Sequence, residues 1–152
     1  MAFENKNTIV ENDDLIIRPY QPEDEEAVID LWFACDLVTA SNNPRRDIER
    51  KLEVNPEMFL VGILEGKLVA TVMGGYEGHR GWVNYLAVAP NLRRLGIGRR
   101  MMEAVERLIV TAGAPKINLQ VRAVNEEVVA FYESIGYKVE PILNLGKRFE
   151  FD

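Results

Sequence analysis

A strand-to-helix join at residues 86–100 constrains this chain more than any other stretch. Residues 86–89 form a short apolar run that Pro90 stops, and from Gly98 onward the apolar residues recur with helical spacing. Gly96 and Gly98 lack a Cβ atom, so the backbone here can adopt positive φ and let its N–H groups converge on an anion. Because these donors open a helix whose dipole is positive at that end, the join predicts a site for phosphate or pyrophosphate.

Arginines surround the same turn. Arg93, Arg94, Arg99 and Arg100 add guanidinium groups, which can bind phosphate oxygens in a bidentate way. A Rossmann fingerprint would need a third glycine where Met101 stands, and a P-loop would need Gly-Lys-Ser/Thr before the helix. The spacing excludes both of these loops. We interpret the join as a pyrophosphate cradle, with a merely solvated basic surface as the alternative.

The composition favours one globular domain that binds a small anion. The chain of 152 residues is 47% apolar and 28% charged, and its formal net charge of −6 argues against a general nucleic-acid binder. We expect a single domain over residues 14–152, with residues 1–13 as a flexible tail or an added edge strand. One cysteine, no apolar window long enough to span a bilayer and no signal-peptide core favour a cytoplasmic protein. We expect no metal, membrane or nucleic-acid partner.

Hydrophobic periodicity and turn signals predict a mixed α/β (α+β) fold. Turns at 65–67 and 77–81 join three strands into an antiparallel meander, and the strand, helix, strand unit at 82–121 predicts two parallel strands. Gly74 and Gly75 indicate a bulge or a close backbone approach. The predicted strands are Leu15–Tyr20, Met58–Leu64, Leu68–Tyr76, Trp82–Ala89 and Lys116–Arg122, with one or two closing strands in Tyr137–Val139 and Ile142–Phe151, and the predicted helices begin near Gln21, Pro44, Gly98 and Asn125.

A second motif makes the interpretation specific. Residues 125–137 read Asn-Glu-Glu-Val-Val-Ala-Phe-Tyr-Glu-Ser-Ile-Gly-Tyr, and residues 93–98 read Arg-Arg-Leu-Gly-Ile-Gly. In order, separation and placement they resemble the Asn-x4-Ala-x-x-Phe-Tyr-Glu-x-x-Gly-Phe/Tyr segment and the Arg/Gln-x-x-Gly-x-Gly/Ala acetyl-CoA motif of the GNAT superfamily of N-acetyltransferases. The order of elements over residues 15–151 resembles that fold as well. The resemblance implies an acyl-CoA N-acyltransferase fold, a central, mostly antiparallel sheet flanked by about four helices.

The resemblance also implies roles for individual residues. In the family, the backbone of the strand matching residues 86–88 pairs with the pantetheine arm as though the cofactor were an extra strand. The strands matching 82–89 and 116–122 splay apart there and admit the thioester. The implied acetyl-CoA contacts are Leu86, Ala87, Val88, Arg93, Arg94, Leu95, Gly96, Ile97, Gly98, Arg99, Asn125 and Tyr132.

Acyl transfer to an amine needs an oxyanion donor and a proton for the departing thiolate. The backbone N–H of Leu86 or Ala87 is the candidate oxyanion donor. Tyr132, which matches a phenol placed near the thioester sulfur, is the candidate general acid, with a purely packing aromatic as the alternative.

The sequence assigns no general base. Residues 119–125 resemble bacterial ribosomal-protein N-terminal acetyltransferases, but those carry a glutamate where this chain has Gln120, and glutamine cannot accept the amine proton. Glu77, His79 or a chain of waters are the remaining candidates.

Three functions therefore stay open. The leading hypothesis is an acetyl-CoA-dependent N-acetyltransferase that acts on a primary amine of a small molecule or a protein, by direct attack in a ternary complex. The alternatives are a protein N-terminal acetyltransferase of the ribosomal type and a non-catalytic acyl-CoA-binding or sensing module. By analogy with the fold, residues 36–43 and 140–147 shape the acceptor site, and a homodimer is possible.

Overall fold

A computed structural model describes residues 14–152, so the predicted tail or edge strand at 1–13 lies outside the described part. Across residues 14–152, five strands form one sheet in the order β1-β2-β3-β4-β5. The pairs from β1 to β4 are antiparallel, and β4 and β5 are parallel, which confirms the predicted mixed sheet. The strands are β1 (Ile16–Pro19), β2 (Phe59–Leu64), β3 (Lys67–Tyr76), β4 (Gly81–Val88) and β5 (Ile117–Leu119).

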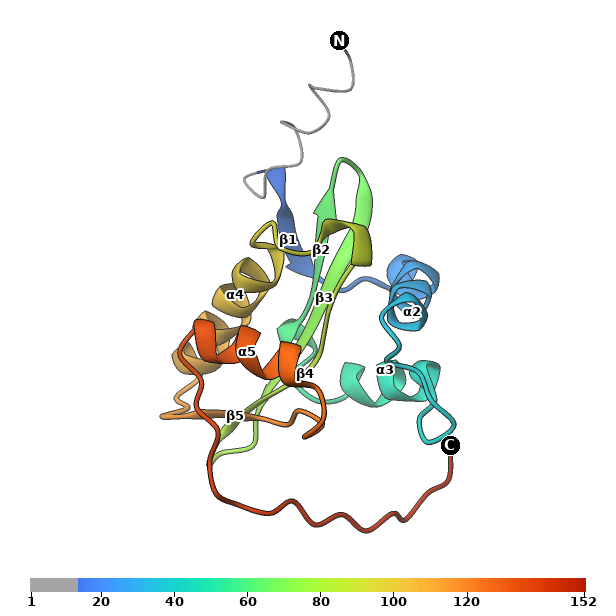
Figure 1. Ribbon diagram of the computed structural model, residues 1–152. Coiled ribbons are helices and arrows are strands. Elements are labelled where there is room, and N and C mark those ends of the chain that lie inside the picture. The colour runs from blue at the N-terminus through green and yellow to red at the C-terminus, as the bar shows by residue number, and fades with distance from the viewer. Residues whose placement is uncertain (1–13) are drawn as a thin grey trace.

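Helices cover both faces of this sheet (Figure 1). On one face lie α2 (Glu25–Ala34) and α3 (Pro44–Leu52), and on the other lie α4 (Ile97–Thr111) and α5 (Glu126–Ser134). Asn43 begins α3 by accepting hydrogen bonds from the N–H groups of Arg45 and Arg46 at 3.1 and 3.3 Å. Within the described part of the chain, no helix is long and apolar enough to cross a membrane.

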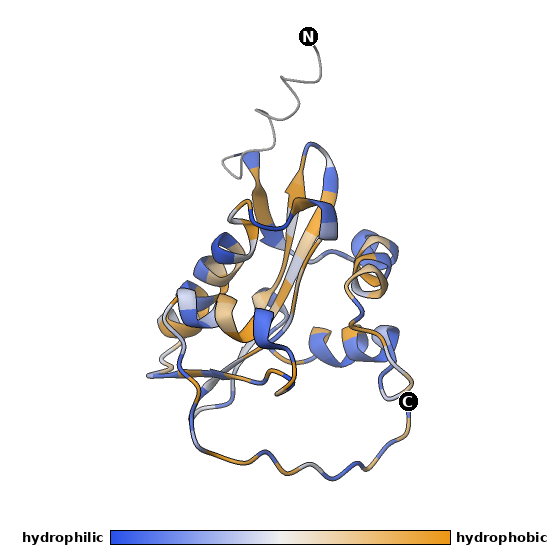
Figure 2. Cartoon of the chain, viewed as in Figure 1, coloured by the Kyte–Doolittle hydropathy of each residue, from blue (hydrophilic) through white to orange (hydrophobic). Residues whose placement is uncertain are grey.

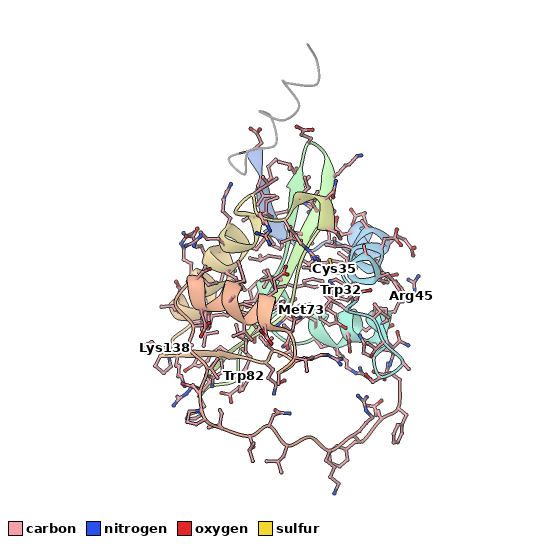
Figure 3. The ribbon with its side chains drawn as sticks, in the orientation of Figure 1. Trp32, Cys35, Arg45, Met73, Trp82 and Lys138 are labelled. Carbon is pink, nitrogen blue, oxygen red and sulfur yellow. The ribbon has the colours of Figure 1, made fainter. Side chains whose placement is uncertain are left out.

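A hydrophobic core fills each side of the sheet, and most strand residues are apolar (Figure 2). Under α2 and α3, Trp32 is fully buried beside Phe59, with ring centroids 6.3 Å apart. Figure 3 shows Trp32 between α2 and the strands. Under α4, which begins at Ile97, Met101 and Val105 are fully buried as the helical spacing predicted, but the stripe continues through the buried Ile109, with Leu108 only half-buried and Ala112 exposed.

Glycines let α4 approach the sheet closely. A Cβ atom on Gly74 would lie 2.5 Å from Val105 Cγ2, and one on Gly81 would lie 2.4 Å from Ile109 Cγ2. The predicted close approach is therefore confirmed at Gly74, whereas Gly75 faces the other side and has ordinary space. The strand register runs without interruption from Met73 to Tyr76, so the bulge predicted as the other option does not occur there.

The predicted closing strands are wrong. Residues 138–152 form no strand, and in Figure 1 they run as an extended segment below β5 toward α3. The segment meets the residues that flank β5 through side chains, as in the ion pair between Lys116 and Glu140 at 2.7 Å, and forms no backbone ladder with it. An alternating apolar pattern cannot show whether a second strand lies alongside it. The predicted strand Lys116–Arg122 is also shorter in the structure, where β5 ends at Leu119.

Candidate active site

The turn before α4 has the backbone of an anion-binding loop. Arg94 and Gly96 both adopt the left-handed conformation, with φ of 67° and 83°. Gly96 is the N-cap of α4, and no side chain from residues 14–152 caps that end. The first N–H groups of an α-helix have no acceptor within the helix, so this end offers donors to an incoming anion.

Arginine side chains frame this helix end. Arg94 and Arg99 are exposed beside the turn, and Arg93 donates from Nε to the carbonyl of Val88 at 3.3 Å. Arg100 points to the start of β1, where its Nη2 donates to the carbonyl of Leu15 at 3.5 Å. No acidic residue stands in the first turn of α4, so the local charge is positive on an otherwise acidic chain.

Gly98 serves a different purpose from the one the sequence suggested. It lies in the first turn of α4 and does not adopt the positive φ that was expected of it. A Cβ atom there would lie 3.2 Å from Phe131 Cζ and 3.7 Å from Val88 Cγ2. The missing side chain therefore lets the start of α4, the end of β4 and α5 meet.

The edge of β4 that faces away from β3 is open over half of its length. β5 pairs only with Gly81, Trp82 and Val83. Within the described residues, no strand continues this pairing along Asn84–Val88, because β5 ends at Leu119. The backbone of Leu86, Ala87 and Val88 is thus placed for an added extended ligand, and this open edge leads to the turn before α4.

A β-bulge interrupts β4 at the same place. Thr71 pairs with Ala87 and Met73 with Asn84, so Tyr85 and Leu86 stand opposite one residue of β3. Tyr85 adopts a φ of 54°, which is uncommon for a residue with a side chain. The buried Thr71 hydroxyl donates to the Tyr85 carbonyl at 2.9 Å.

Trp32 holds this bulge from the helical layer. Its Nε1 donates to the Thr71 hydroxyl at 2.9 Å, and its ring stacks on the Tyr85 ring with centroids 3.8 Å apart. Every partner in this chain of contacts is wholly or largely buried, so the bulge conformation is fixed by the core.

Tyr132 lies on α5, which covers the same face of the sheet as α4 (Figure 1). Its ring packs against Phe131 and Tyr137, with centroids 5.1 and 5.7 Å away. Burial raises the pKa of Tyr132 to about 12, and its hydroxyl has no hydrogen-bond partner within residues 14–152. By contrast, the Tyr137 hydroxyl donates to Glu106 at 2.7 Å and ties the turn after α5 to α4. Tyr132 therefore stays protonated at neutral pH with a proton available to donate.

On the opposite face of β4, Tyr85 joins a polar cluster that the sequence did not reveal. The Tyr85 hydroxyl donates to Asp47 Oδ2 at 2.6 Å and accepts from Asn42 Nδ2 at 2.7 Å. Burial first, and then the Asp47 carboxylate, raise the pKa of Tyr85 well above its usual range. Asn42 belongs to the break at 36–43, so this contact brings the predicted acceptor loop to β4. The sequence carried no signal for the cluster, because residue 47 reads as one more charged position on an exposed helix.

The remaining predicted residues take structural positions. Asn125 is the N-cap of α5 and accepts from the N–H of Val128 at 3.3 Å. Gln120 donates to Asn144. Glu77 accepts from the N–H groups of His79 and Arg80 in the β3–β4 turn, and these backbone bonds lower the pKa of Glu77. That turn lies before Gly81, and Gly81 is five strand residues or ~16 Å from Leu86. The side chains of Glu77 and His79 therefore do not reach the bulge.

Comparison with known proteins identifies the family of this chain. Residues 19–137 match the model of the acetyltransferase (GNAT) family. The chain belongs to the GNAT family. An acetyltransferase of Pectobacterium atrosepticum is 45% identical over 132 residues, which span 87% of this chain and 94% of that protein. The family model and this relative are both acetyltransferases, and the match covers nearly the whole of the relative. The chain is therefore an acetyltransferase.

Solved structures agree on the GNAT fold. Ard1 from Thermoplasma volcanium superposes with a TM-score of 0.73 at 25% identity, covering 84% of each chain. AAC(6')-Iy, solved in complex with a CoA bisubstrate analogue, superposes with a TM-score of 0.73 at 14% identity, covering 89% of this chain and 99% of that one. At this identity the second likeness shows the fold alone. The GNAT fold predicted from the two motifs is confirmed.

Proposed function

We propose that this GNAT protein transfers the acetyl group of acetyl-CoA to a primary amine by direct attack in a ternary complex. One observation carries the proposal: the edge of β4 at residues 84–88, which no strand of residues 14–152 covers, runs from the start of α4, which no side chain of those residues caps, to the bulge at Tyr85 and Leu86. A phosphate-bearing cofactor with an extended arm fits this path. Its pyrophosphate would meet the N–H groups of α4 with Arg94 and Arg99, and its arm would pair with β4.

In this arrangement the acetyl group is transferred next to the bulge. The amine nitrogen attacks the thioester carbonyl carbon, and the N–H of Leu86 or Ala87 stabilises the resulting oxyanion. As the C–S bond breaks, the thiolate takes a proton from the Tyr132 hydroxyl, which solvent then restores. The excess proton of the amine leaves to solvent, since Gln120, Glu77 and His79 are engaged or distant.

The acceptor approaches from the α2–α3 side in this proposal. Asp47 and the ring of Tyr85 lie there, and a carboxylate beside an aromatic face suits a cationic amine. The ribosomal N-terminal type is disfavoured, because Gln120 is held by Asn144 and has no basic oxygen for the amine proton.

A kinetic comparison tests the proposal. Replacing Tyr132 with Phe removes the proton donor but keeps the packing ring, so kcat with an amine acceptor falls by roughly 10²-fold or more while the affinity for acetyl-CoA is retained. Tyr137→Phe is the matched control, since it removes a hydroxyl from the same aromatic cluster that is bonded to Glu106 and not available to the reaction. Turnover unchanged in Tyr132→Phe would overturn the acid role. Saturable acetyl-CoA binding without turnover on a broad panel of amines would select a binding module.

A further inference from the structure

Two arginines on α3, Arg46 and Arg50, hold carboxylates from residues 150–152 of the same chain. Asp152 sits on Arg50 in a bidentate way, with Oδ1 2.8 Å from Nη2 and Oδ2 2.9 Å from Nη1. Glu150 Oε1 lies 3.3 Å from Arg46 Nη2. The Asp152 side chain is only 9% exposed in this contact. Planar guanidinium groups bind carboxylates in this two-pronged way, so Arg50 and its neighbour form a carboxylate site.

Charge, and not packing, keeps residues 150–152 on α3. Phe149 and Phe151 flank Glu150 and are 82% and 89% exposed, so they bury little apolar surface there. Figure 1 shows the segment at residues 138–152 reaching α3 as an extended, outlying strap. A hollow of about 560 Å³ lies beside the contact, lined by Arg50 and by residues 146–150 and 152. A second carboxylate that enters this hollow can replace that of Asp152 without changing the net charge at Arg50.

The carboxylate site continues into the acceptor side of the proposed active site. Arg50 Nη1 donates to Asp47 Oδ1 at 3.2 Å, and Asp47 Oδ2 accepts from the Tyr85 hydroxyl at 2.6 Å. Burial, the Asp47 carboxylate and, to a smaller extent, the charge of Asp152 raise the pKa of Tyr85, so Asp152 lies within electrostatic reach of the bulge. A guanidinium that holds a carboxylate therefore lies directly beside a carboxylate that suits an ammonium group.

We propose that the amine acceptor carries a carboxylate a few bonds from its amine, as an α-amino acid does, and that Arg50 binds this carboxylate in place of Asp152. The proposal rests on the proposed function and names the substrate class of the same site. Because Asp47 and Arg50 are in hydrogen-bond contact, they can bind both charged groups of one acceptor only where these groups are close together. An amine without a carboxylate would leave Asp152 on Arg50 and gain nothing from the arginine.

Paired acceptors test the proposal on the full chain. L-α-amino acids with uncharged side chains differ from their α-carboxamides in the carboxylate, and kcat/KM is expressed per neutral amine, since the carboxamides have less basic amines. We expect an amino acid to be acetylated with a kcat/KM roughly tenfold or more above that of its carboxamide, the value of about one charged hydrogen bond. Arg50→Gln should bring this ratio to about one.

The internal carboxylate has a variant of its own. Asp152→Asn frees Arg50, so the KM for the amino acid should fall roughly two- to fivefold, the value of an exposed ion pair, while the KM for the carboxamide stays the same. Glu140→Gln is the matched control. It removes one carboxylate from the same segment and breaks the ion pair with Lys116, away from α3, and it should change neither KM.

The outcomes separate this inference from the proposed function. Equal kcat/KM for amino acids and carboxamides, or a KM for the amino acid that Asp152→Asn does not lower, would overturn the carboxylate site. Turnover of carboxamides or other amines that lack a carboxylate would then leave the proposed function standing. Absence of turnover with every amine would overturn both.

Discussion

The hydroxyl of Tyr85 on β4 donates a 2.6 Å hydrogen bond to Asp47 on α3, across 38 positions of the sequence. The bond joins the bulge of the central sheet to the helical layer from which we propose that the acceptor approaches. It places a carboxylate next to the strand along which we propose that the acetyl group lies. In the proposed function, the acceptor side of the site is thus built on the same residue that forms the bulge.

Removing this bond should affect the amine and spare the cofactor. Tyr85→Phe keeps the stack on Trp32 but leaves Asp47 with one fewer partner, so we expect the KM for the amine to rise roughly tenfold, the value of about one hydrogen bond. The affinity for acetyl-CoA should stay unchanged in calorimetry. Tyr76→Phe removes a hydroxyl in the β3–β4 turn and serves as the control. A loss of acetyl-CoA affinity with an unchanged KM for the amine would place Tyr85 in the cofactor site and contradict its role on the acceptor side.

The pH dependence of turnover should lack an alkaline limb. Burial raises the pKa of Tyr132 to about 12, so its proton is retained throughout the range in which an amine acceptor becomes neutral. We expect kcat/KM to rise with pH until the amine is deprotonated and then to stay level up to pH 10, after subtraction of the enzyme-free rate. An alkaline fall with a midpoint below pH 10 that disappears in Tyr132→Phe would contradict the raised pKa of Tyr132.

The close approach of α4 to the sheet makes a stability prediction. Gly74→Ala should lower the free energy of unfolding by about 1–3 kcal/mol, because the added Cβ would meet Val105 and Ile109 well inside contact distance. Gly75→Ala, one residue along the same strand, has ordinary space and should change it by less than about 0.5 kcal/mol. Urea unfolding of both variants measures the difference. Equal losses would show that the strand, not the helix contact, sets the cost.

An ion pair near β1 should make stability depend on pH. Asp24 accepts from Arg18 at 2.8 and 3.0 Å and from the N–H of Gln21 at 2.8 Å. The hydrogen bond from Arg18 lowers the pKa of Asp24, so its contribution is present at neutral pH and is lost as the pH falls below about 4.

Asp24→Asn should therefore destabilise the protein by about 1–3 kcal/mol at pH 7 and by much less at pH 3. Asp30→Asn alters an exposed carboxylate on α2 and should show no such pH dependence. Unfolding by urea at both pH values gives the comparison. A deficit that persists undiminished at pH 3 would mean that packing and not charge explains it.

Local signals predicted most of the fold. The antiparallel meander of β2, β3 and β4, the parallel pair of β4 and β5, and the approximate helix starts were predictable, because turn residues, caps and apolar spacing all act within a few positions of the chain. The turn before α4, with its left-handed glycine and flanking arginines, was predictable for the same reason, although Gly98 was assigned backbone freedom when its actual constraint is Phe131, a residue 33 positions away.

What the sequence did not predict depends on contacts between distant segments. Tyr85 is the extra residue of a bulge that Thr71 and Trp32 hold, and no pattern within β4 marks it. Residues 142–151 alternate as a strand does, but a strand forms only where a neighbour offers its backbone. Within the described chain, no such neighbour lies beside them.

The cradle before α4 is the central claim, and titration calorimetry with acetyl-CoA tests it most directly. Arg99→Glu reverses an exposed charge in the first turn of α4, and Arg107→Glu makes the same change two turns further along the same exposed face. We expect saturable binding to the wild type, a roughly 10- to 100-fold weaker affinity in Arg99→Glu, corresponding to about 1.5–3 kcal/mol for a charged hydrogen bond, and no change in Arg107→Glu. No binding to the wild type, or equal weakening in both variants, would contradict the account.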